Sequence, residues 1–388
     1  MRPLEGRRLW FVGIGGAGLS SYAFLSRAWG AEVGGWDRVD TPYLRPLRDV
    51  ELSIAPEPVV PDEWEVVVSS AFPSVPGRSR ADFLAELVSL RRSIVVAGAH
   101  GKTTTTAMIA YALAELGHDP AWLVGGEIEQ LGGNAGAGEG WLVVEGDESD
   151  RTVERLRPEI AVVLNVELDH HATFASEGEV AEMFERWLGE VPQVVRGWEL
   201  EPVSFELAAP GGHNRRNAAA ALAALELAGV ARTDAEPVLA RFRGAGRRFQ
   251  LVGEKNGVTV VDDYAHHPSE IVATVSAARE RTDGRVLVLF QPHLYSRTRH
   301  LAPELGAALS TADAACVTDV YRAREQPVDG VTGKLVVDAL RPGLRAGWAP
   351  SVEDGARIVA SWARSGDLVL TVGAGDVDRA GTMILEAL

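Results

Sequence analysis

The sequence predicts an α/β fold of three domains, each built around a mainly parallel sheet. Strand-like apolar runs alternate with helical patterns along the whole chain, which is the order of elements that parallel sheets require. The 388 residues are enough for two or three domains, each with its own core. Polar or glycine-rich turns separate the runs, and we expect the domains to cover residues 1–91, 92–243 and 244–388.

The individual elements follow from the same alternation. In the first domain the run RRLWFVGIG predicts a strand and a glycine-rich turn, a helix follows over 17–29, and EVGGWD and EVVVSSA predict further strands. The second domain opens with the strand SIVVAG and a helix over 102–117, and later has helices over 177–190 and 214–229. In the third domain the strands VTVVDD, RVLVLFQ, AACVTDV and DLVLTVG each precede a helical pattern.

Composition and charge restrict the possible functions. A formal net charge of -16 argues against a general nucleic-acid-binding protein, because phosphate contacts need a basic face. The single cysteine, Cys316, excludes an intrachain disulfide and a zinc site of several thiolates, and favours a reducing, cytoplasmic location. No apolar run has transmembrane length, so no stable membrane insertion is expected. A monomer and a homodimer are both compatible with the sequence.

The stretch GIGGAG, residues 13–18, matches the pattern G-x-G-x-x-G between a strand and a helix. Glycines in such a turn let a pyrophosphate approach the backbone, and the helix N-terminus supplies hydrogen-bond donors. Asp37 ends the second strand-like run, where a carboxylate can contact a ribose. We therefore expect a nucleotide or nucleotide-sugar site, with a purely structural tight turn as the alternative.

The stretch AGAHGKTTTT, residues 97–106, predicts a phosphate-binding loop. It keeps the short pattern G-x-x-G-K-T between a strand and a helix, although Val96 stands where the usual leading glycine would be. Lys102 can pair with the β and γ phosphates of ATP, and Thr103 can ligate Mg²⁺. Only three of the 38 basic residues are lysines, which makes a lysine at this position informative. A helix N-terminus capped by threonines is the alternative.

Two polar turns that follow later strands can complete a metal site. The segment VVEGDESD places Glu145, Asp147, Glu148 and Asp150 at a strand end, where P-loop proteins carry a carboxylate for Mg²⁺. The segment LNVELDHH places His170 at the end of the next strand. A solvated acidic loop and a surface or capping histidine are the alternatives.

Turns of the C-terminal half are rich in histidine, arginine and asparagine. The segment PGGHNRRNAAAA offers Asn214 and Asn217 at a helix start, and GRRFQ offers Arg247 and Arg248, which can neutralise a transferring phosphoryl group. Six of the nine histidines lie in such turns, a clustering that packing alone does not explain. In open α/β sheets ligands bind at the carboxyl ends of strands. The strand ends DDYAHHPSE and FQPHLYSRTR supply the other candidates: Asp262, Asp263, Tyr264, His266, His267, His293, Tyr295 and Arg297.

Together these stretches resemble the Mur ligase family, and within it the alanine-adding branch. The matching segments run in the family's order across nearly the whole chain. They are GIGGAGLSS, VVVSSA, AHGKTTTT, EGDESD, NVELDH, GGHNRRNAAAA, RRF, DDYAHHPSEI, FQPHLYSRT and VYRAREQPVDGV. The segments DDYAHHP and FQPH are specific to the alanine-adding branch and its close relatives.

The resemblance implies an N-terminal Rossmann-like domain that binds a UDP-sugar. It also implies a central P-loop ATPase-like domain with a parallel or mixed sheet, and a C-terminal Rossmann-like domain that closes over ATP and the amino acid. The implied cofactors are ATP and Mg²⁺. The implied reaction, in peptidoglycan precursor synthesis, begins when ATP phosphorylates the carboxylate of UDP-N-acetylmuramate. The amine of L-alanine then attacks the acyl phosphate, which yields an amide, ADP and phosphate.

The resemblance also implies roles for individual residues. The implied catalytic residues are Lys102, Glu145, His170 and Arg248, and the implied metal ligands are Thr103, Glu145 and His170. The implied ATP site comprises Gly98, His100, Gly101, Lys102, Thr103, Thr104, Asn214, Asn217, Arg248 and Asp263. The implied substrate site comprises Gly15, Gly16, Ala17, Gly18, Asp37, Ser70, Tyr264, His266, His267, His293 and Arg297.

The sequence departs from the usual family pattern at several points. Ala99 stands where the phosphate loop usually has threonine, and Leu294 stands where an arginine often follows QPH. No lysine lies between residues 102 and 255, so the carbamylated lysine of several sister ligases has no counterpart, in keeping with the alanine-adding branch. Only 42 residues separate His170 from His213, which implies a shortened central domain.

Four alternative functions remain open from the sequence. A ligase that attaches a preformed peptide to the same UDP-sugar, or a Mur-type ligase with another carboxylate substrate, would use the same ATP chemistry. A dinucleotide-dependent oxidoreductase would explain the first glycine-rich turn but not the phosphate loop or the acidic turns. A UDP-sugar-sensing protein without catalysis would not need the lysine and the metal ligands. L-alanine is not distinguished from glycine or L-serine, because one methyl or hydroxyl group changes binding only modestly.

Overall fold

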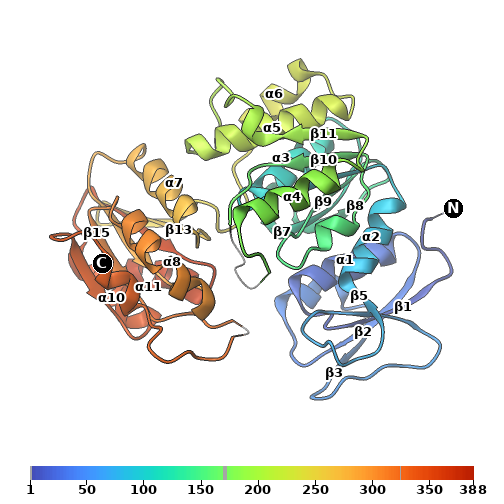
Figure 1. Cartoon of the computed structure of the whole chain (residues 1–388), viewed down its shortest axis with the longest axis horizontal. Coiled ribbons are helices and arrows are strands. Elements are labelled where there is room, and N and C mark those ends of the chain that lie inside the picture. Colours follow the sequence, from blue (N-terminus) through green and yellow to red (C-terminus); the bar gives the residue numbers. More distant parts are fainter. Residues whose placement is uncertain (1, 169–172, 324) are drawn as a thin grey trace. The chain divides into compact units, whose positions relative to one another are not determined.

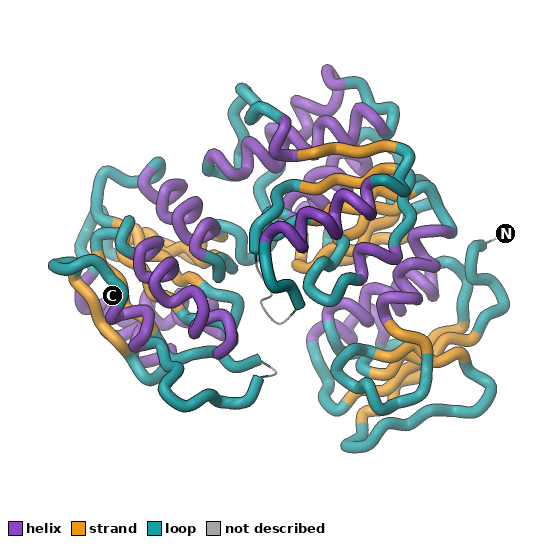
Figure 2. The backbone as a smooth tube through the Cα atoms, in the orientation of Figure 1, coloured by secondary structure: helices purple, strands orange, loops and turns teal. Residues whose placement is uncertain are grey.

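The computed structural model describes residues 2–168, 173–323 and 325–388 (Figure 1). Helices and strands alternate along the chain (Figure 2), and the strands form three separate sheets, which confirms the predicted α/β class. The chain divides into two compact units, of which the first holds two sheets and the second holds one. The first comprises Met1–Glu167, Glu177–Glu206 and Arg216–Arg243, and the second Leu168–Ser176, Leu207–Arg215 and Gly244–Leu388.

The first sheet is parallel throughout and has the strand order β3-β2-β1-β4-β5 of a Rossmann-like sheet. Its strands are β1 (Arg8–Val12), β2 (Glu32–Asp37), β3 (Glu51–Ile54), β4 (Glu65–Val68) and β5 (Arg78–Ser79). Its helices are α1 (Ala17–Ala28), α2 (Arg80–Ser89) and the 3-10 helix Pro42–Leu47. Phe83 of α2 meets Phe11 edge to face, and the opposite face of the sheet carries Trp10, Trp36 and Val68.

The second sheet has the order β11-β10-β6-β9-β7-β8 and is parallel except for the β7–β8 hairpin. Its strands are β6 (Ser93–Ala97), β7 (Ala121–Ile128), β8 (Gly133–Ala137), β9 (Leu142–Glu145), β10 (Ile160–Val163) and β11 (Gln193–Arg196). The helices of this part are α3 (Lys102–Glu115), α4 (Glu177–Leu188), α5 (Gly212–Leu227) and α6 (Arg232–Ala240), with 3-10 turns at Glu129–Leu131, Thr152–Arg155 and Gly197–Glu199. Strand β6 lies in the middle and is buried along its whole length, so the phosphate loop that follows it starts from a rigid strand.

The third sheet has the order β12-β13-β17-β14-β15-β16 and is parallel except for the edge strand β12. Its strands are β12 (Gln250–Lys255), β13 (Val258–Asp263), β14 (Val286–Phe290), β15 (Ala314–Val317), β16 (Arg345–Trp348) and β17 (Leu368–Val372). The helices are α7 (Pro268–Arg279), α8 (Tyr295–Leu309), α9 (Lys334–Asp338), α10 (Val352–Trp362) and α11 (Ala380–Ala387), with a 3-10 turn at Asp376–Arg379. Side chains of alternate strand residues belong to two apolar clusters. One cluster packs against α7, α8 and α9, and the other packs against α10 and α11.

The sequence located the helices well. The ends of α1, α3, α4 and α5 all fall within two residues of the expected positions. The domain boundaries at 91 and 243 stay predictions, because the first two sheets belong to one compact unit. Within the part of the chain that the structure describes, no helix combines the length and the apolar character needed to cross a membrane.

Close packing in the first sheet depends on Gly34 of β2. Its neighbour on β1 is Trp10, which is 1% exposed and meets Trp64 edge to face. A Cβ atom on Gly34 would lie 2.6 Å from a ring carbon of Trp10. The indole therefore occupies the space that any other side chain would need.

We expect Gly34→Ala to lower the free energy of unfolding by about 1–3 kcal/mol, because the added methyl forces Trp10 out of its packed position. Urea unfolding followed by tryptophan fluorescence measures the change. Gly212→Ala is the matched control, since no heavy atom lies within 4 Å of its added Cβ. Equal effects of the two substitutions would contradict the packing argument.

Candidate functional site

The glycine-rich turn between β1 and α1 is closed by Asp37. Its Oδ2 accepts a hydrogen bond from the Gly15 amide at 2.7 Å, and the Thr41 hydroxyl donates to the Gly15 carbonyl at 2.7 Å. A Cβ atom on Gly15 would lie 2.9 Å from Asp37 Oδ2, so only glycine lets the carboxylate approach. Asp37, expected at a ribose, thus also holds the turn in shape.

Other predicted residues of this turn face outward. Gly16 and Gly18 are exposed, Gly16 precedes α1 without a capping side chain, and Ala17 begins the helix. The amides of a first helical turn lack intrahelical acceptors and favour an anion. Ser70 is exposed and follows β4, the strand beside β1. The geometry therefore suits an anionic ligand above this edge of the first sheet.

The phosphate loop joins β6 to α3 and is shaped by two glycines. Gly98 has φ 125° and Gly101 has φ 82°, values that side chains rarely adopt. A Cβ atom on Gly101 would lie 2.4 Å from Asn217 Oδ1, because α5 brings this asparagine against the loop. Asn214 lies one turn earlier on α5, where its Nδ2 donates to the Pro210 carbonyl at 2.7 Å. Asn217 thus lies directly beside the loop.

Lys102 is the centre of the loop. Its Nζ donates to Glu148 Oε1 at 2.8 Å, to the Gly98 carbonyl at 2.6 Å and to the Ala99 carbonyl at 3.3 Å. Burial alone would lower the pKa of Lys102, but Glu148 and the other nearby carboxylates outweigh it and raise the pKa above its ordinary value. Lys102 is therefore a full cation at neutral pH. Glu148 is 3% exposed and belongs to the predicted acidic turn, but the sequence does not indicate that it is the lysine's partner.

Two of the three predicted metal ligands lie together. The Thr103 hydroxyl donates to Glu145 Oε2 at 3.2 Å, and the Gly125 amide donates to Glu145 Oε1 at 2.6 Å. A hydroxyl and a carboxylate are the oxygen ligands that Mg²⁺ prefers, so the pair fits this ion. His170, the third predicted ligand, lies outside the described residues. Thr104, the next residue of α3, is buried and points away from solvent.

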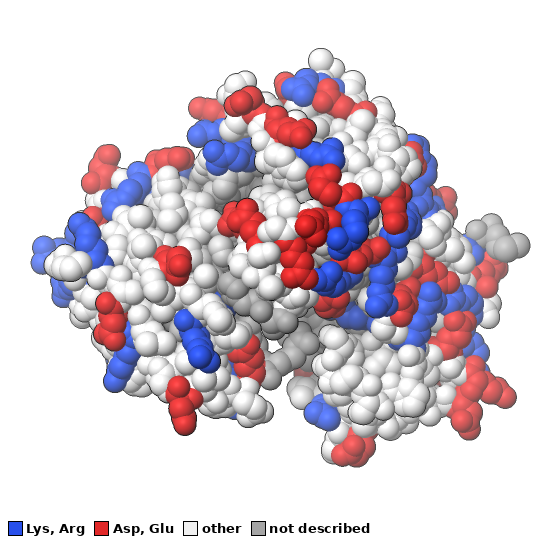
Figure 3. All heavy atoms as spheres, viewed as in Figure 1, with Lys and Arg blue, Asp and Glu red and all other residues white. Residues whose placement is uncertain are grey.

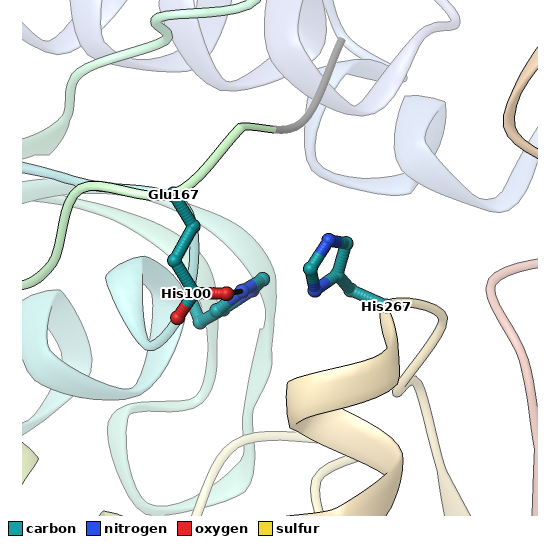
Figure 4. A group of neighbouring side chains, drawn as sticks. All are labelled: His100, Glu167 and His267. Atoms are coloured by element: carbon teal, nitrogen blue, oxygen red, sulfur yellow. Dashed lines mark hydrogen bonds and ion pairs between the residues drawn. The ribbon is translucent and has the colours of Figure 1, made fainter. Parts of the chain in front are cut away.

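His100 ties the phosphate loop to the turn after β10. Its amide donates to Asn165 Oδ1 at 2.9 Å, and Asn165 Nδ2 donates back to the His100 carbonyl at 3.0 Å. The His100 Nε2 atom lies 3.0 Å from Glu167 Oε2, and the two side chains lie side by side (Figure 4). His267, also drawn there, is the N-cap residue that precedes α7 in the second unit. The loop thus has polar links to the turns after both neighbouring strands, β9 and β10.

In the second unit, Asp263 ends β13 and organises the segment RRF. Its two carboxylate oxygens accept hydrogen bonds from the amides of Phe249 and Ala265, each at 2.8 Å. Arg247 and Phe249 have φ of 56° and 53°, which is uncommon for residues with side chains and is typical of functional sites. Burial raises the pKa of Asp263 to about 6, although Arg248 and the two amides oppose the shift.

The two arginines of this segment differ in role. Arg247 is a structural residue, because it donates to Asp262 at 2.9 Å and to the carbonyls of Gly373 and Gly375 at 2.8 and 3.0 Å. Arg248 lies over the ring of Tyr264, with 5.0 Å between the guanidinium carbon and the ring centre. Arg247 also lies over this ring, at 5.2 Å, so the two arginines differ in their hydrogen bonds and not in their contact with Tyr264.

Glu270 joins several of those residues, and the sequence reasoning missed it. Its Oε2 accepts from the amides of His266 and His267 at 2.9 and 3.1 Å, and its Oε1 lies 3.6 Å from Arg248 Nη1. The segment HPSE carries the signal that could have revealed it: a helix start with proline at the first position and glutamate at the third.

The predicted aromatic and histidine residues form a row. Tyr264 and His266 meet edge to face at 5.5 Å between ring centres, and His266 and His293 follow at 5.9 Å. His293 stacks on Tyr321 at 5.8 Å, and Arg297 Nη1 donates to His293 Nδ1 at 3.1 Å. The chain thus groups residues from three separate turns of the third sheet. Tyr321 is an addition that the sequence reasoning left out of the site.

Charge on the molecular surface is mixed. On the face drawn in Figure 3, among the residues the structure describes, basic and acidic side chains alternate and form no extended basic patch. This distribution agrees with the net charge of -16 and offers no broad surface for a polyanion on this face.

These features define a class: an α/β protein with a P-loop-type phosphate site and a second, histidine-rich strand-end site. Two family models match the chain, the Mur ligase middle domain over residues 96–193 and the glutamate ligase domain of Mur ligases over residues 247–375. Together with the relatives described next, these matches show that the chain belongs to the Mur ligase family.

Two curated relatives and one solved structure illustrate the similarity. The UDP-N-acetylmuramate–L-alanine ligase of Streptomyces coelicolor is 41% identical, with 97% of each chain covered. The enzyme of the same name from Streptomyces griseus is 39% identical, with 100% of this chain and 98% of the relative covered. The structure of UDP-N-acetylmuramate-alanine ligase from Thermotoga maritima has a TM-score of 0.79 and 26% identity, with 98% of each chain covered.

The comparison also bears on chain length. The alignment with the S. coelicolor relative runs over 450 residues, whereas this chain has 388. The relative therefore contains segments without a counterpart here. That the shortening lies in the central domain stays a prediction from the spacing of His170 and His213.

The raised pKa of Asp263 predicts a pH-dependent stability. Between its ordinary value of 3.8 and about 6, the unfolded chain has released this proton while the folded chain retains it. Rising pH through that window therefore favours unfolding, by up to roughly 3 kcal/mol once pH exceeds the folded value. Asp263→Asn has no proton to release, so its free energy of unfolding should fall less over the same window in urea titrations.

Asp367→Asn is the matched control for this experiment. Burial would raise the pKa of Asp367, but its bonds to Arg285 and to backbone amides outweigh burial and lower it. Wild-type Asp367 therefore gains its stabilising effect as pH rises to about 3.8, below the window of Asp263. Its replacement should lower the free energy of unfolding by a nearly constant amount within that window and leave the decline unchanged. Identical pH trends in the two variants would refute the assignment to Asp263.

Proposed function

We propose that this chain is an ATP-dependent amide ligase that joins L-alanine to the carboxylate of UDP-N-acetylmuramate through an acyl phosphate. The observation that carries the proposal is the convergence of Lys102, Thr103 and Glu145 in a phosphate loop, in a chain about 40% identical to ligases of that name over nearly its full length. The activity belongs to peptidoglycan precursor synthesis. A cytoplasmic location goes with this proposal, because ATP is the energy source.

The first unit supplies the phosphate chemistry in this proposal. ATP phosphates would compete with Glu148 for the Lys102 ammonium, which is fully charged and already desolvated. Thr103 and Glu145 would hold Mg²⁺, which would neutralise charge on the phosphates when bound. Phosphoryl transfer needs alignment and charge neutralisation rather than covalent help from the protein, and these residues suit that task. His170 is proposed as a further ligand on the family resemblance alone.

The second unit supplies the remaining contacts in this proposal. Arg248 would neutralise the transferring phosphoryl group, and Asp263 would hold the ribose of ATP while it fixes the segment around Arg248. The row from Tyr264 to Arg297 would border the amino acid and the muramoyl group. His293 accepts from Arg297 through Nδ1, so that nitrogen carries no proton. The neutral imidazole then carries its proton on Nε2 and can donate it to an oxygen of a bound substrate.

The first glycine-rich turn would hold the UDP-sugar. Exposed Gly16 and Gly18 and the open first turn of α1 suit its pyrophosphate. The same turn would serve a ligase that attaches a preformed peptide, or one that uses another carboxylate. A comparison of amines therefore separates the candidate ligases. L-alanine, glycine, L-serine and a preformed peptide are each offered with UDP-N-acetylmuramate and ATP.

Phosphate release from ATP and Mg²⁺ should require both UDP-N-acetylmuramate and L-alanine. Lys102→Ala should lower the rate by about 100- to 1000-fold, because one preorganised charge on the phosphates is lost. Lys334→Ala is the matched control: it removes an exposed lysine of α9, which lies over Trp348, and should leave the rate unchanged.

Three results would count against the proposal. Phosphate release without the UDP-sugar would indicate a different acceptor, and release driven only by a peptide would indicate the recycling activity. Equal rates for wild type and Lys102→Ala would mean that this loop does not hold the reacting phosphates.

A further inference from the structure

Arg80 occupies a position that helix stability does not explain. It is the first residue of α2, where Ser79 caps the helix by accepting from the Asp82 amide at 3.1 Å. A cation in a first helical turn is opposed by the helix dipole. The side chain is 25% exposed, and its Nε atom is buried without a hydrogen-bond partner in the described structure. Some other interaction must therefore favour an arginine here.

The Arg80 guanidinium lies between the two predicted ligand-binding loops of the first unit. On one side, a Cβ atom built on Gly18 would lie 3.9 Å from Arg80 Nη1, so the guanidinium lies beside the first turn of α1. On the other side, Arg80 Nη2 donates to Asp147 Oδ2 at 3.3 Å. That distance is long for a charge-assisted hydrogen bond, which is usually about 2.7–2.9 Å.

Asp147 belongs to the acidic turn that arranges the phosphate loop. It lies between Glu145, which accepts from Thr103, and Glu148, which accepts from Lys102. Its own Oδ1 accepts from the amide and the hydroxyl of Ser149, at 2.9 and 2.5 Å. A shift of Asp147 would therefore also move the carboxylates of Glu145 and Glu148.

The charges around the Arg80 guanidinium agree with a link between α1 and the acidic turn. Burial raises the pKa of Tyr22, one turn beyond Gly18 on α1, to about 12, and Arg80 opposes that rise. The carboxylates of Asp147 and Asp150 attract the Arg80 guanidinium. The guanidinium thus faces α1 on one side and two acidic side chains of the ATP turn on the other.

We propose that Arg80 is a positioning residue that, through Asp147, couples ligand binding at the glycine-rich turn to the arrangement of the phosphate loop. An anion bound beside Gly18 draws the Arg80 guanidinium toward α1 and changes its hydrogen bond to Asp147. The acidic turn then sets Glu145 and Glu148, and with them Thr103 and Lys102. The inference rests on the proposed function for the identity of the two ligands, a UDP-sugar and an adenine nucleotide.

Nucleotide affinity tests this coupling without any catalytic step. The dissociation constant of a fluorescent ADP analogue with Mg²⁺ is measured with and without saturating UDP-N-acetylmuramate. We expect wild type to show a coupling factor on the order of tenfold. Arg80→Gln should reduce it to less than about twofold, and Arg80→Lys should restore part of it, because lysine keeps the charge but loses the planar fork.

Two further variants separate coupling from folding. Arg78→Gln removes an exposed arginine two residues away that pairs with Glu86 at 2.5 Å, and it should keep the wild-type factor. Asp147→Asn changes the other end of the link and should lose the coupling as Arg80→Gln does, which keeps the test decisive even when Arg80→Gln folds poorly. The double variant should lose no more than either single one, since both remove one interaction.

The outcomes distinguish this inference from the proposed function. A wild type that forms the amide but shows no coupling, or an Arg80→Gln variant that keeps it, overturns the role of Arg80 alone. Equal losses in Arg78→Gln and Arg80→Gln also overturn it. An Arg80-dependent coupling in a chain that forms no amide with L-alanine supports the inference and overturns the proposed reaction.

Discussion

The first unit depends on keeping one ammonium charged inside a buried loop. Desolvation disfavours the charge on Lys102, and the carboxylate of Glu148 with two backbone carbonyls outweighs it. The surrounding structure supplies each of these groups: β6 and the glycines bring the carbonyls, and the turn after β9 brings Glu148. Most of the polar groups around the phosphate loop can be understood as groups that surround and stabilise the Lys102 ammonium.

In the second unit the buried charged group is an acid rather than a base. Asp263 is a buried carboxylate whose oxygens accept two backbone amides rather than a close cation. Those bonds hold the unusual backbone of the RRF segment and direct Arg248 toward Tyr264. In both units a buried charge fixes a loop, and the loop in turn places the side chains that can contact a ligand.

Local patterns were sufficient to predict the elements but not their contacts. The helix starts at Ala17 and Lys102 follow glycine-rich turns, and such signals involve only neighbouring residues. The bond from Lys102 to Glu148 joins residues 46 apart, and nothing in the acidic turn indicates which of its carboxylates meets the lysine. The segments GIGGAG and DDYAHHP located the candidate regions, whereas Arg80 belongs to no motif and became visible only through its neighbours in space.

Asn217 fills the place where a side chain of residue 101 would be, and this has a consequence for how the family can diverge. The amide oxygen and a methyl group cannot share that space, so the two positions cannot drift independently. A residue larger than glycine at 101 would need a shift of the Asn217 side chain or a smaller residue at 217. The phosphate loop and α5 are therefore linked through this one contact, and a change at either position alone disturbs the other.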